Sequence, residues 1–378
     1  MYKIISQYKL ISRYCLNTQI HDFWIFLYLC AMLKKILQIL FFFGLGATVM
    51  GLVFRSQNMA YQAECRQSGV PEADCSLMDK LLYDFSTVQP GWIILVLLAF
   101  TISNMFRARR QQLLLAPMGY QAGFLSSFLS ILLGYFANLG FPRIGEVVRA
   151  GALARAERIP LEKVMGTLVI DRLMDVVCLV LVMGLAFLLE GDTLLQFFVQ
   201  NKGSGVAATP FWLRPWFLAL AGAALIGGVL VVIFRNKIRQ LPVFEKVTSI
   251  LQGFIAGLRS VLQLKRPVEF IVCSVGIWLM FYLQCRFNLL AFAPTAHLSA
   301  SATLMIFIFG TLGFVIPSPG GMGTFHALCI AGLALYGISG GDAFSYANIA
   351  FFTVQIFYNL VAGIISLLLL PMVKKTGE

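Results

Sequence analysis

Charged residues are scarce in this chain of 378 residues. They make up 12% of the sequence, whereas 59% of the residues are hydrophobic and the mean hydropathy is +0.83. A soluble domain carries roughly 25% charged residues, because its surface must face water. The shortage excludes an ordinary soluble enzyme, a disordered chain and a fibrous protein. It predicts an all-α polytopic integral membrane protein.

Motifs for catalysis and metal binding are also missing. The chain has only three histidines, and its eight cysteines include no Cys-x-x-Cys pair, so no multi-histidine metal centre or zinc knuckle is expected. There is no His-Glu-x-x-His motif and no Walker loop. We therefore expect no metal, no cofactor and no enzymatic activity. A membrane-embedded lipid transferase is kept as a minor alternative.

Apolar segments follow one another along the chain, and a full crossing needs about 20 residues. They fall near 36–54, 91–106, 121–141, 164–189, 214–234, 269–292, 299–316, 323–338 and 345–370. The connections between them are too short for a separate soluble domain. We expect one membrane domain over residues 32–378. Residues 1–31 are expected to be an extension that results from a mis-assigned start, with Met32 as the natural start; an amphipathic lead or a signal peptide are the alternatives.

The distribution of basic residues predicts the orientation. Lys and Arg concentrate in one set of loops, among them 107–110, 143–163 and 235–266, and short loops rich in these residues stay in the cytoplasm. The formal net charge of +12 is therefore a topology signal, and no nucleic-acid partner is expected. The sequence predicts a cell inner-membrane protein with both termini in the cytoplasm.

Two apolar segments cannot be single crossings in this orientation. Segment 121–141 lies between two basic loops, and segment 299–338 lies between two loops without Lys or Arg. Both ends of each segment must therefore face the same side of the membrane. We predict a re-entrant hairpin for the first, and a second hairpin or two short crossings for the other. The fold then has six to eight transmembrane helices plus one or two re-entrant hairpins.

Breaks in the helical pattern locate the expected tips, because proline removes a backbone donor and glycine permits left-handed backbone. The first break is marked by Asn138, Gly140 and Pro142, and Asn138 is also expected among the residues that bind the lipid. The second break is marked by Pro317, Pro319, Gly320, Gly321, Gly323, Thr324 and His326. Thr324 is expected to cap the half-helix that follows. A plain helix–helix turn at a membrane surface is the alternative for the second break.

Similar tripeptides precede the two breaks at comparable distances. They are Leu133-Gly134-Tyr135 and Leu312-Gly313-Phe314. Together with hairpins that open to opposite sides, they predict an inverted repeat. Discontinuous helices in corresponding halves point to the binding site of a transporter.

Charged residues beside the first break are candidate contacts for a lipid phosphate. Arg143, Glu146 and Arg149 recur every three residues, so a helix would carry them as one stripe of net positive charge. Arginine suits this role because its planar fork matches phosphate geometry. The alternative is an amphipathic helix that lies on anionic lipid.

A second charged group lies inside segment 164–189. Asp171 and Asp175 are four residues apart and share a helix face, and Arg172 can reach Asp175. Charges within a membrane are costly, so they line a pathway or pair with one another. We expect Arg172 to attract the lipid phosphate, and Asp171 and Asp175 to balance that charge or to meet a cationic headgroup. Arg286, deep in segment 269–292, is a further candidate phosphate contact, with snorkelling to the outer interface as its alternative.

One cysteine pair falls in an acidic loop that the topology places outside. Cys65 and Cys75 lie in the loop 55–89. Because the periplasm is oxidising, a disulfide between them is expected.

Three stretches in this order resemble the transmembrane, flippase-like domain of lysylphosphatidylglycerol synthase. They are GYFANLGFPRIGEVVRA (134–150), VMGTLVIDRLMDVV (164–177) and PSPGGMGTFHAL (317–328). The resemblance spans roughly 32–373 and implies a stand-alone member without the aminoacyltransferase domain. His326 departs from the family, in which an acidic residue is expected after Gly-Thr-Phe.

The resemblance implies a protein that moves a lipid between the leaflets of the inner membrane. The lipid would be an anionic phospholipid or a polyprenyl-phosphate lipid. The alternative is a non-catalytic membrane partner of a separate lipid-modifying transferase.

Overall fold

The computed structural model describes residue 48 and residues 51–59, 61–63, 65–66, 75–140, 144–200, 264–316, 318–338 and 340–373, with the backbone alone for 192–200. Within these ranges all regular secondary structure is helical, which confirms the all-α prediction. The predicted crossing 214–234 and the extension 1–31 lie outside the described residues.

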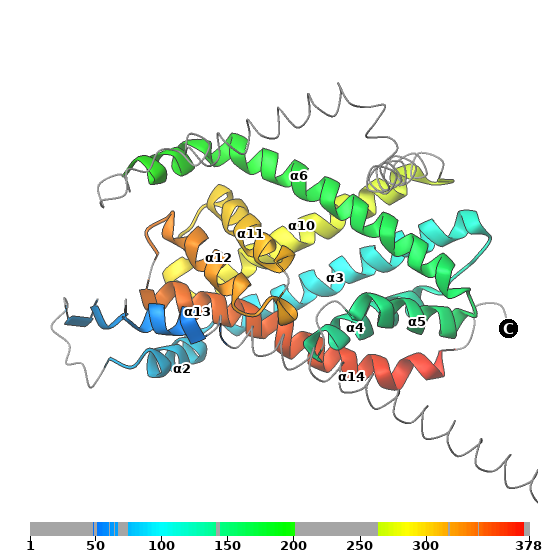
Figure 1. Ribbon diagram of the computed structural model, residues 1–378, viewed down its shortest axis with the longest axis horizontal. Helices are drawn as coiled ribbons and strands as arrows, with labels where there is room; N and C mark the ends of the chain where they lie inside the picture. The colour runs from blue at the N-terminus through cyan, green and yellow to red at the C-terminus, as the bar shows by residue number, and fades with distance from the viewer. Residues whose placement is uncertain are drawn as a thin grey trace, which may run out of the picture.

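Four rods in the described part of the chain are long and apolar enough to cross a membrane. They are α3 (Pro90–Leu115), α6 (Leu161–Gln200), α10 (Pro267–Ala291) and α13 (Gly340–Phe351) with α14 (Asn359–Leu369), which the π-helical turn η7 (Phe352–Tyr358) joins. Even α10, with 25 residues, spans roughly 38 Å at 1.5 Å per residue, more than the ~30 Å hydrocarbon core. Figure 1 shows these rods extending along the length of the molecule.

Helices α3 and α10 form an antiparallel pair at the centre of the bundle. At one end, the amide of Gln89 donates to the carbonyl of Ala291 at 3.0 Å. At the other end, Arg109 Nε lies 2.6 Å from Glu269 Oε1. Between them, the ring of Phe106 occupies the space beside Gly276 that a Cβ would fill. This pair forms the frame on which the hairpins and α6 pack.

The first predicted hairpin consists of α4 (Phe124–Gly140) and α5 (Gly145–Glu157). The second consists of α11 (Ala300–Val315) and α12 (Thr324–Ala334), joined by the short turn η6 (Pro319–Gly321). These helices have 17, 13, 16 and 11 residues, so none of the four reaches the roughly 30 Å of a full crossing. The second segment is therefore a hairpin of two half-helices and not two short crossings.

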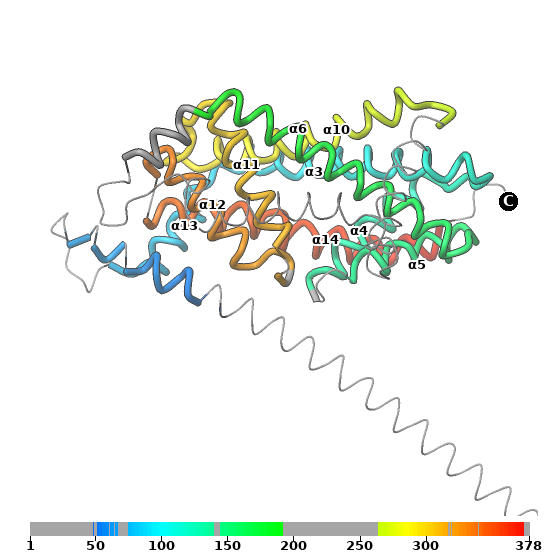
Figure 2. The backbone as a smooth tube through the Cα atoms, turned by 45° about the horizontal axis from the view of Figure 1, so that its top comes forward, coloured from blue at the N-terminus to red at the C-terminus, as the bar shows by residue number. Residues whose placement is uncertain are grey.

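The two hairpins open toward opposite ends of the molecule, and their tips meet near its middle (Figure 2). Helix α4 contacts the η6 turn. A Cβ placed on Gly320 would lie 4.0 Å from the carbonyl oxygen of Asn138. The paired breaks in the sequence thus come together in space.

Each hairpin closes through the glycine of its tripeptide. Gly134 packs on the backbone of Gly145, where added Cβ atoms would overlap the facing carbonyl oxygens. Gly313 packs equally closely on the backbone of Thr324 and Phe325. Gly145 and Thr324 both come eleven residues after the glycine. This correspondence supports the predicted inverted repeat.

The end opposite the basic loops carries a small helix, α2 (Leu77–Thr87). Ser76 caps it by accepting from the amide of Asp79 at 3.3 Å. Lys80 binds Asp342 at 2.8 Å and ties α2 to α13. Just before α2, Cys65 and Cys75 form a disulfide. Short 3-10 turns complete the described elements, namely η2 (Ala116–Met118), η5 (Ala293–Thr295) and η8 (Leu370–Met372).

Candidate functional site

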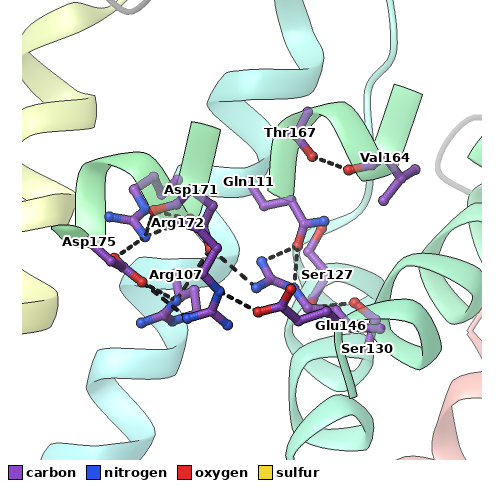
Figure 3. Close-up of polar contacts among 12 residues, drawn as sticks. Arg107, Gln111, Ser127, Ser130, Glu146, Val164, Thr167, Asp171, Arg172 and Asp175 are labelled. Carbon is purple, nitrogen blue, oxygen red and sulfur yellow. Dashed lines mark hydrogen bonds and ion pairs between the residues drawn. The ribbon is translucent and has the colours of Figure 1, made fainter. Parts of the chain in front are cut away.

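Three helices bring charged side chains together beside the tip of the first hairpin (Figure 3). Helix α3 supplies Arg107 and Arg110, α5 supplies Arg149, and α6 supplies Asp171 and Asp175. We call these five residues the charge cluster. Four of them are at most 4% exposed, and the Asp175 side chain is 15% exposed. The cluster is therefore an interior feature of the protein.

Asp171 lies at the centre of the charge cluster. Its Oδ1 accepts from Arg110 Nε at 2.7 Å, and its Oδ2 accepts from Arg107 Nη1 and Arg149 Nη1, each at 3.3 Å. Three guanidinium groups from two other helices thus converge on one carboxylate. Such pairing offsets part of the high cost of burying each charge.

Asp175 lies one helical turn further along α6 and binds the same two arginines of α3. Its Oδ1 accepts from Arg110 Nη2 at 2.6 Å, and its Oδ2 accepts from Arg107 Nη1 at 3.0 Å. The expected contact with Arg172 is present at 3.4 Å. Because the two carboxylates share a helix face, one pair of arginines can bridge both.

An exposed ion pair borders the cluster. Arg172 Nε lies 2.6 Å from Glu146 Oε1, and their side chains are 48% and 43% exposed. This pair connects α6 to the start of α5. It therefore marks the edge at which the charge cluster meets the surroundings of the protein.

Polar uncharged side chains extend the cluster along α3 and α10. Gln111 Oε1 accepts from Arg149 Nη2 at 2.7 Å and from Arg149 Nε at 3.2 Å. Ser274 Oγ accepts from Arg110 Nη1 at 3.3 Å. Tyr135 of α4 lies in the neighbourhood of Arg107 and Arg149. The cluster thus reaches toward the hairpin tip, because Tyr135 is one turn before Asn138.

Asn138 fixes the tip of the first hairpin. Its Oδ1 accepts from the backbone amide of Gly145 at 2.8 Å, which joins the end of α4 to the start of α5. Gly140 is the last residue of α4. Pro142 and Arg143, which were predicted to mark the break and to bind phosphate, lie outside the described residues.

The second tip is built on left-handed glycines. Gly320, Gly321 and Gly323 have φ values of 56°, 83° and 81°, a region that side-chain-bearing residues rarely adopt. Pro319 opens the η6 turn between α11 and α12, and Pro317 lies outside the described residues. The break that was predicted from these residue types is therefore present.

The predicted capping role of Thr324 is wrong. Gly323 occupies the cap position of α12, and no side chain caps that helix. The Thr324 hydroxyl instead donates to the carbonyl of Gly313 at 2.8 Å and lies 2.7 Å from Ser318 Oγ. It closes the hairpin because the close approach of Gly313 brings a carbonyl within its reach.

His326 follows this tip and is fully buried. Its ring centroid lies 4.8 Å from that of Phe351 and 5.7 Å from that of Phe325. Its surroundings are aromatic, in contrast to the arginines and carboxylates beside the first tip.

Arg286 lies elsewhere. It is near the C-terminal end of α10 and donates to the carbonyl of Leu298 and, at 3.4 Å, to Thr303 Oγ1. Ser274, which contacts the charge cluster, is twelve residues earlier on the same helix, which corresponds to roughly 18 Å. The structure therefore separates Arg286 from the other predicted charged residues, whereas it brings Glu146, Arg149, Asp171, Arg172 and Asp175 together.

The sequence analysis missed Arg107, Arg110 and Gln111, because it assigned these arginines to a cytoplasmic loop. In the structure α3 continues to Leu115, nine residues beyond the predicted end of the apolar segment. The spacing of these three residues could have indicated their role. Positions 107, 110 and 111 share one helix face, and two buried carboxylates on another helix require cationic partners. In the described ranges, no group of three or more His, Cys, Asp or Glu residues could hold a metal ion.

Paired half-helices that meet beside buried charge, within a frame of long apolar helices, define this protein as a polytopic membrane protein with discontinuous helices. The chain belongs to the family described as the lysylphosphatidylglycerol synthase TM region, whose model matches residues 73–362. The chain is also similar to UPF0104 membrane protein MJ1595 of Methanocaldococcus jannaschii, with 29% identity over 101 residues. That match covers 26% of this chain and 30% of the relative's length. No solved structure matches the chain.

Proposed function

We propose that this protein is a lipid translocase of the cell inner membrane. The headgroup of a phosphate-bearing lipid passes between the two hairpin tips, while its acyl chains stay in the bilayer. The observation that carries this proposal is the meeting of two half-helix hairpins, from opposite ends of the molecule, beside buried and net positive charge.

The physical argument begins with the cost of the hairpins. Backbone that leaves the helical pattern at membrane depth is tolerated only when protein surrounds it or when it lines a wet cavity. Ionisable groups within membrane segments usually belong to a pathway or a pair. Both features occur together where Asn138 faces Gly320 and Arg149 lies one turn from Gly145. A single route past both tips accounts for this coincidence.

The orientation follows from the basic loops. We place the open end of the α4–α5 hairpin, and both chain termini, on the cytoplasmic side. The disulfide Cys65–Cys75 then lies on the periplasmic side, where oxidising conditions preserve it. The charge cluster falls in the cytoplasmic half of the membrane domain. No nucleotide-binding motif accompanies it in the sequence, so the proposed movement is facilitated exchange or is coupled to an ion gradient.

A second candidate function is that of a non-catalytic partner of a separate transferase. The description of the family favours this candidate, because it refers to the transmembrane region of a synthase. In this case the chain would present or receive a lipid that another protein modifies. Co-purification with such an enzyme, without lipid movement by this chain alone, would support this candidate.

The test of the proposed function is leaflet exchange in proteoliposomes. Fluorescent phosphatidylglycerol is placed in the inner leaflet, and an external reductant quenches each molecule that reaches the outer leaflet. Arg172→Gln should slow exchange several-fold, because Arg172 borders the charge cluster. Arg266→Gln is the matched control, since both arginines contact an acidic residue three positions away at 3.4 Å.

Two results would count against translocation. One is exchange no faster than that of empty liposomes for several anionic lipids, with and without an ion gradient. The other is equal slowing by Arg172→Gln and Arg266→Gln, which would show a general effect of removing surface charge.

A further inference from the structure

The charge cluster is not electrically balanced. Three buried guanidinium groups, on Arg107, Arg110 and Arg149, face only the carboxylates of Asp171 and Asp175 among the residues that the structure describes. The bordering Arg172 and Glu146 neutralise each other. One positive charge is therefore buried without a counter-charge, which is costly unless an anion joins it.

Most of the hydrogen bonds that are left unmade beside the cluster belong to donors, although Asn104 Oδ1, one turn before Arg107 on α3, is an unpaired acceptor among the described residues. Arg107 Nε, Gln111 Nε2 and Ser127 Oγ are buried and have no partner within the described ranges. Their residues are 3%, 1% and 0% exposed. The amide of Gln111 is oriented by the network, because its oxygen accepts two bonds from Arg149, which can only donate. These buried donors beside the charge cluster could therefore bind acceptor oxygens of a ligand.

These donors lie on facing helices. Arg107 and Gln111 are four residues apart on α3 and share a face. Ser127 comes from α4, and Figure 3 shows it beside Gln111. Tyr135, two turns further along α4, lies in the neighbourhood of Arg107 and Arg149. The donors therefore follow the α3–α4 boundary toward the hairpin tip.

By contrast, every carboxylate oxygen of the cluster already accepts at least one hydrogen bond from an arginine. Asp171 Oδ1 accepts from Arg110, and its Oδ2 accepts from Arg107 and Arg149. Asp175 Oδ1 also accepts from Arg110, and its Oδ2 from Arg107 and Arg172. A cationic headgroup would find no free carboxylate oxygen in the cluster.

We infer that Arg107, Gln111 and Ser127 bind the phosphate of a lipid whose headgroup has a net negative charge, and that Asp171 and Asp175 position the arginines without contacting the headgroup. This inference rests on the proposed function and deepens it. It assigns the substrate class as a phosphodiester with an uncharged remainder, and it excludes lipids with a cationic headgroup from tight binding.

Binding is tested without transport, on the full chain purified in an uncharged detergent. The probes are phosphatidylglycerol, phosphatidylethanolamine, a lysyl ester of phosphatidylglycerol and inorganic phosphate, and native mass spectrometry measures their occupancy. Phosphatidylglycerol should bind about tenfold more tightly than the two lipids that carry an ammonium group. Inorganic phosphate that competes as well as the lipid would overturn the lipid assignment in favour of a free phosphate.

Two variants examine the donors. Ser127→Ala removes a hydroxyl that has no partner, so it should fold normally and weaken phosphatidylglycerol binding several-fold. Ser130→Ala is its matched control on α4, because the buried Ser130 hydroxyl donates to the carbonyl of Ser127 and is not part of the site. Equal binding by the two variants would overturn the role of Ser127.

Gln111→Glu examines the missing charge. The new carboxylate keeps the acceptor for Arg149, removes the donor and supplies the counter-charge. It should raise thermal stability without lipid and abolish the preference for phosphatidylglycerol. Unchanged lipid binding by this variant would overturn the inference. If binding behaves as expected and leaflet exchange is absent, the site stands and translocation fails.

Discussion

Replacing Asp171 with Asn should lower the free energy of unfolding by more than the loss of an exposed ion pair does. The substitution keeps the size of the side chain and removes its charge. Arg107, Arg110 and Arg149 all contact this carboxylate, and Asp171 is 1% exposed. After the change, the three buried guanidinium groups retain only Asp175 as a counter-charge among the described residues.

The expected magnitude follows from the burial. Removing one partner from a buried ion pair costs about 3–5 kcal/mol, because the remaining charge stays buried without compensation. This corresponds to roughly two to three and a half powers of ten in the folding equilibrium constant. The matched control is Glu146→Gln, whose 43% exposed side chain pairs with Arg172. An exposed pair of this kind contributes roughly 0–1 kcal/mol.

The free energy of unfolding can be measured in mixed micelles by titration with a denaturing detergent. A companion variant carries Arg149→Met in addition to Asp171→Asn, which restores the original excess of one positive charge. It should be more stable than the sum of the two single changes predicts, by about 0.5–3 kcal/mol, because the two groups are in contact. A loss below about 1 kcal/mol for Asp171→Asn, equal to that of Glu146→Gln, would refute the interpretation of the cluster as a set of buried, interdependent charges.

Two further predictions concern the packing of the hairpin and of α2. Gly145→Ala should destabilise the α4–α5 hairpin by about 1–3 kcal/mol, because the added Cβ would overlap the carbonyl oxygen of Gly134. Gly151→Ala in the same helix places its Cβ in open space and should be neutral or stabilising. The same detergent titration compares the free energies of unfolding of the two variants. Burial is the largest single effect on Lys80 and lowers its pKa, but the hydrogen bonds and charge attractions of Asp342 and Asp84 together outweigh burial and raise the pKa above its usual 10.5. The contribution of the Lys80–Asp342 pair is therefore present at neutral pH and lost as pH rises through the raised pKa. The protection factors of the α2 amides, which correct for the intrinsic pH dependence of exchange, should fall only in strongly alkaline solution. For Lys80→Met they should already be lower at pH 7.

The hairpins were predictable from the sequence because their signal is electrostatic and lies in the loops. Segment 121–141 has basic loops on both sides, and segment 299–338 has loops without Lys or Arg on both sides. The loop charges therefore predict that both ends of each segment face the same side of the membrane. This argument needs no knowledge of side-chain packing. The loop charges did not decide whether segment 299–338 forms a hairpin or two short crossings. The helix lengths of 16 and 11 residues in that segment favour the hairpin.

Only part of the charge cluster was predictable from the sequence. Arg149, Asp171 and Asp175 were predicted, whereas Arg107 and Arg110 were missed because their burial depends on how far α3 extends. Hydropathy ended segment 91–106 before Arg107, and Arg107, Arg109 and Arg110 were counted as loop charges. In the structure the helix continues, and Arg107 and Arg110 turn inward while Arg109 pairs with Glu269 near the surface. Only the position of α6 decides which arginines are buried, and that position is a tertiary property. Asp171 indicated that partners must exist but not which ones.

The two hairpins share a backbone arrangement but not a chemistry. Each hairpin closes where a glycine packs on the backbone of the following helix. The glycines are Gly134 and Gly313, and the facing residues, Gly145 and Thr324, both come eleven positions later. Beside the first tip are arginines and carboxylates, whereas beside the second His326 packs between the rings of Phe325 and Phe351. If the pseudo-symmetry served stability alone, similar residue types on both sides would satisfy it. The difference therefore indicates that the two tips have different roles, and under the proposed translocation only the first tip would bind the phosphate.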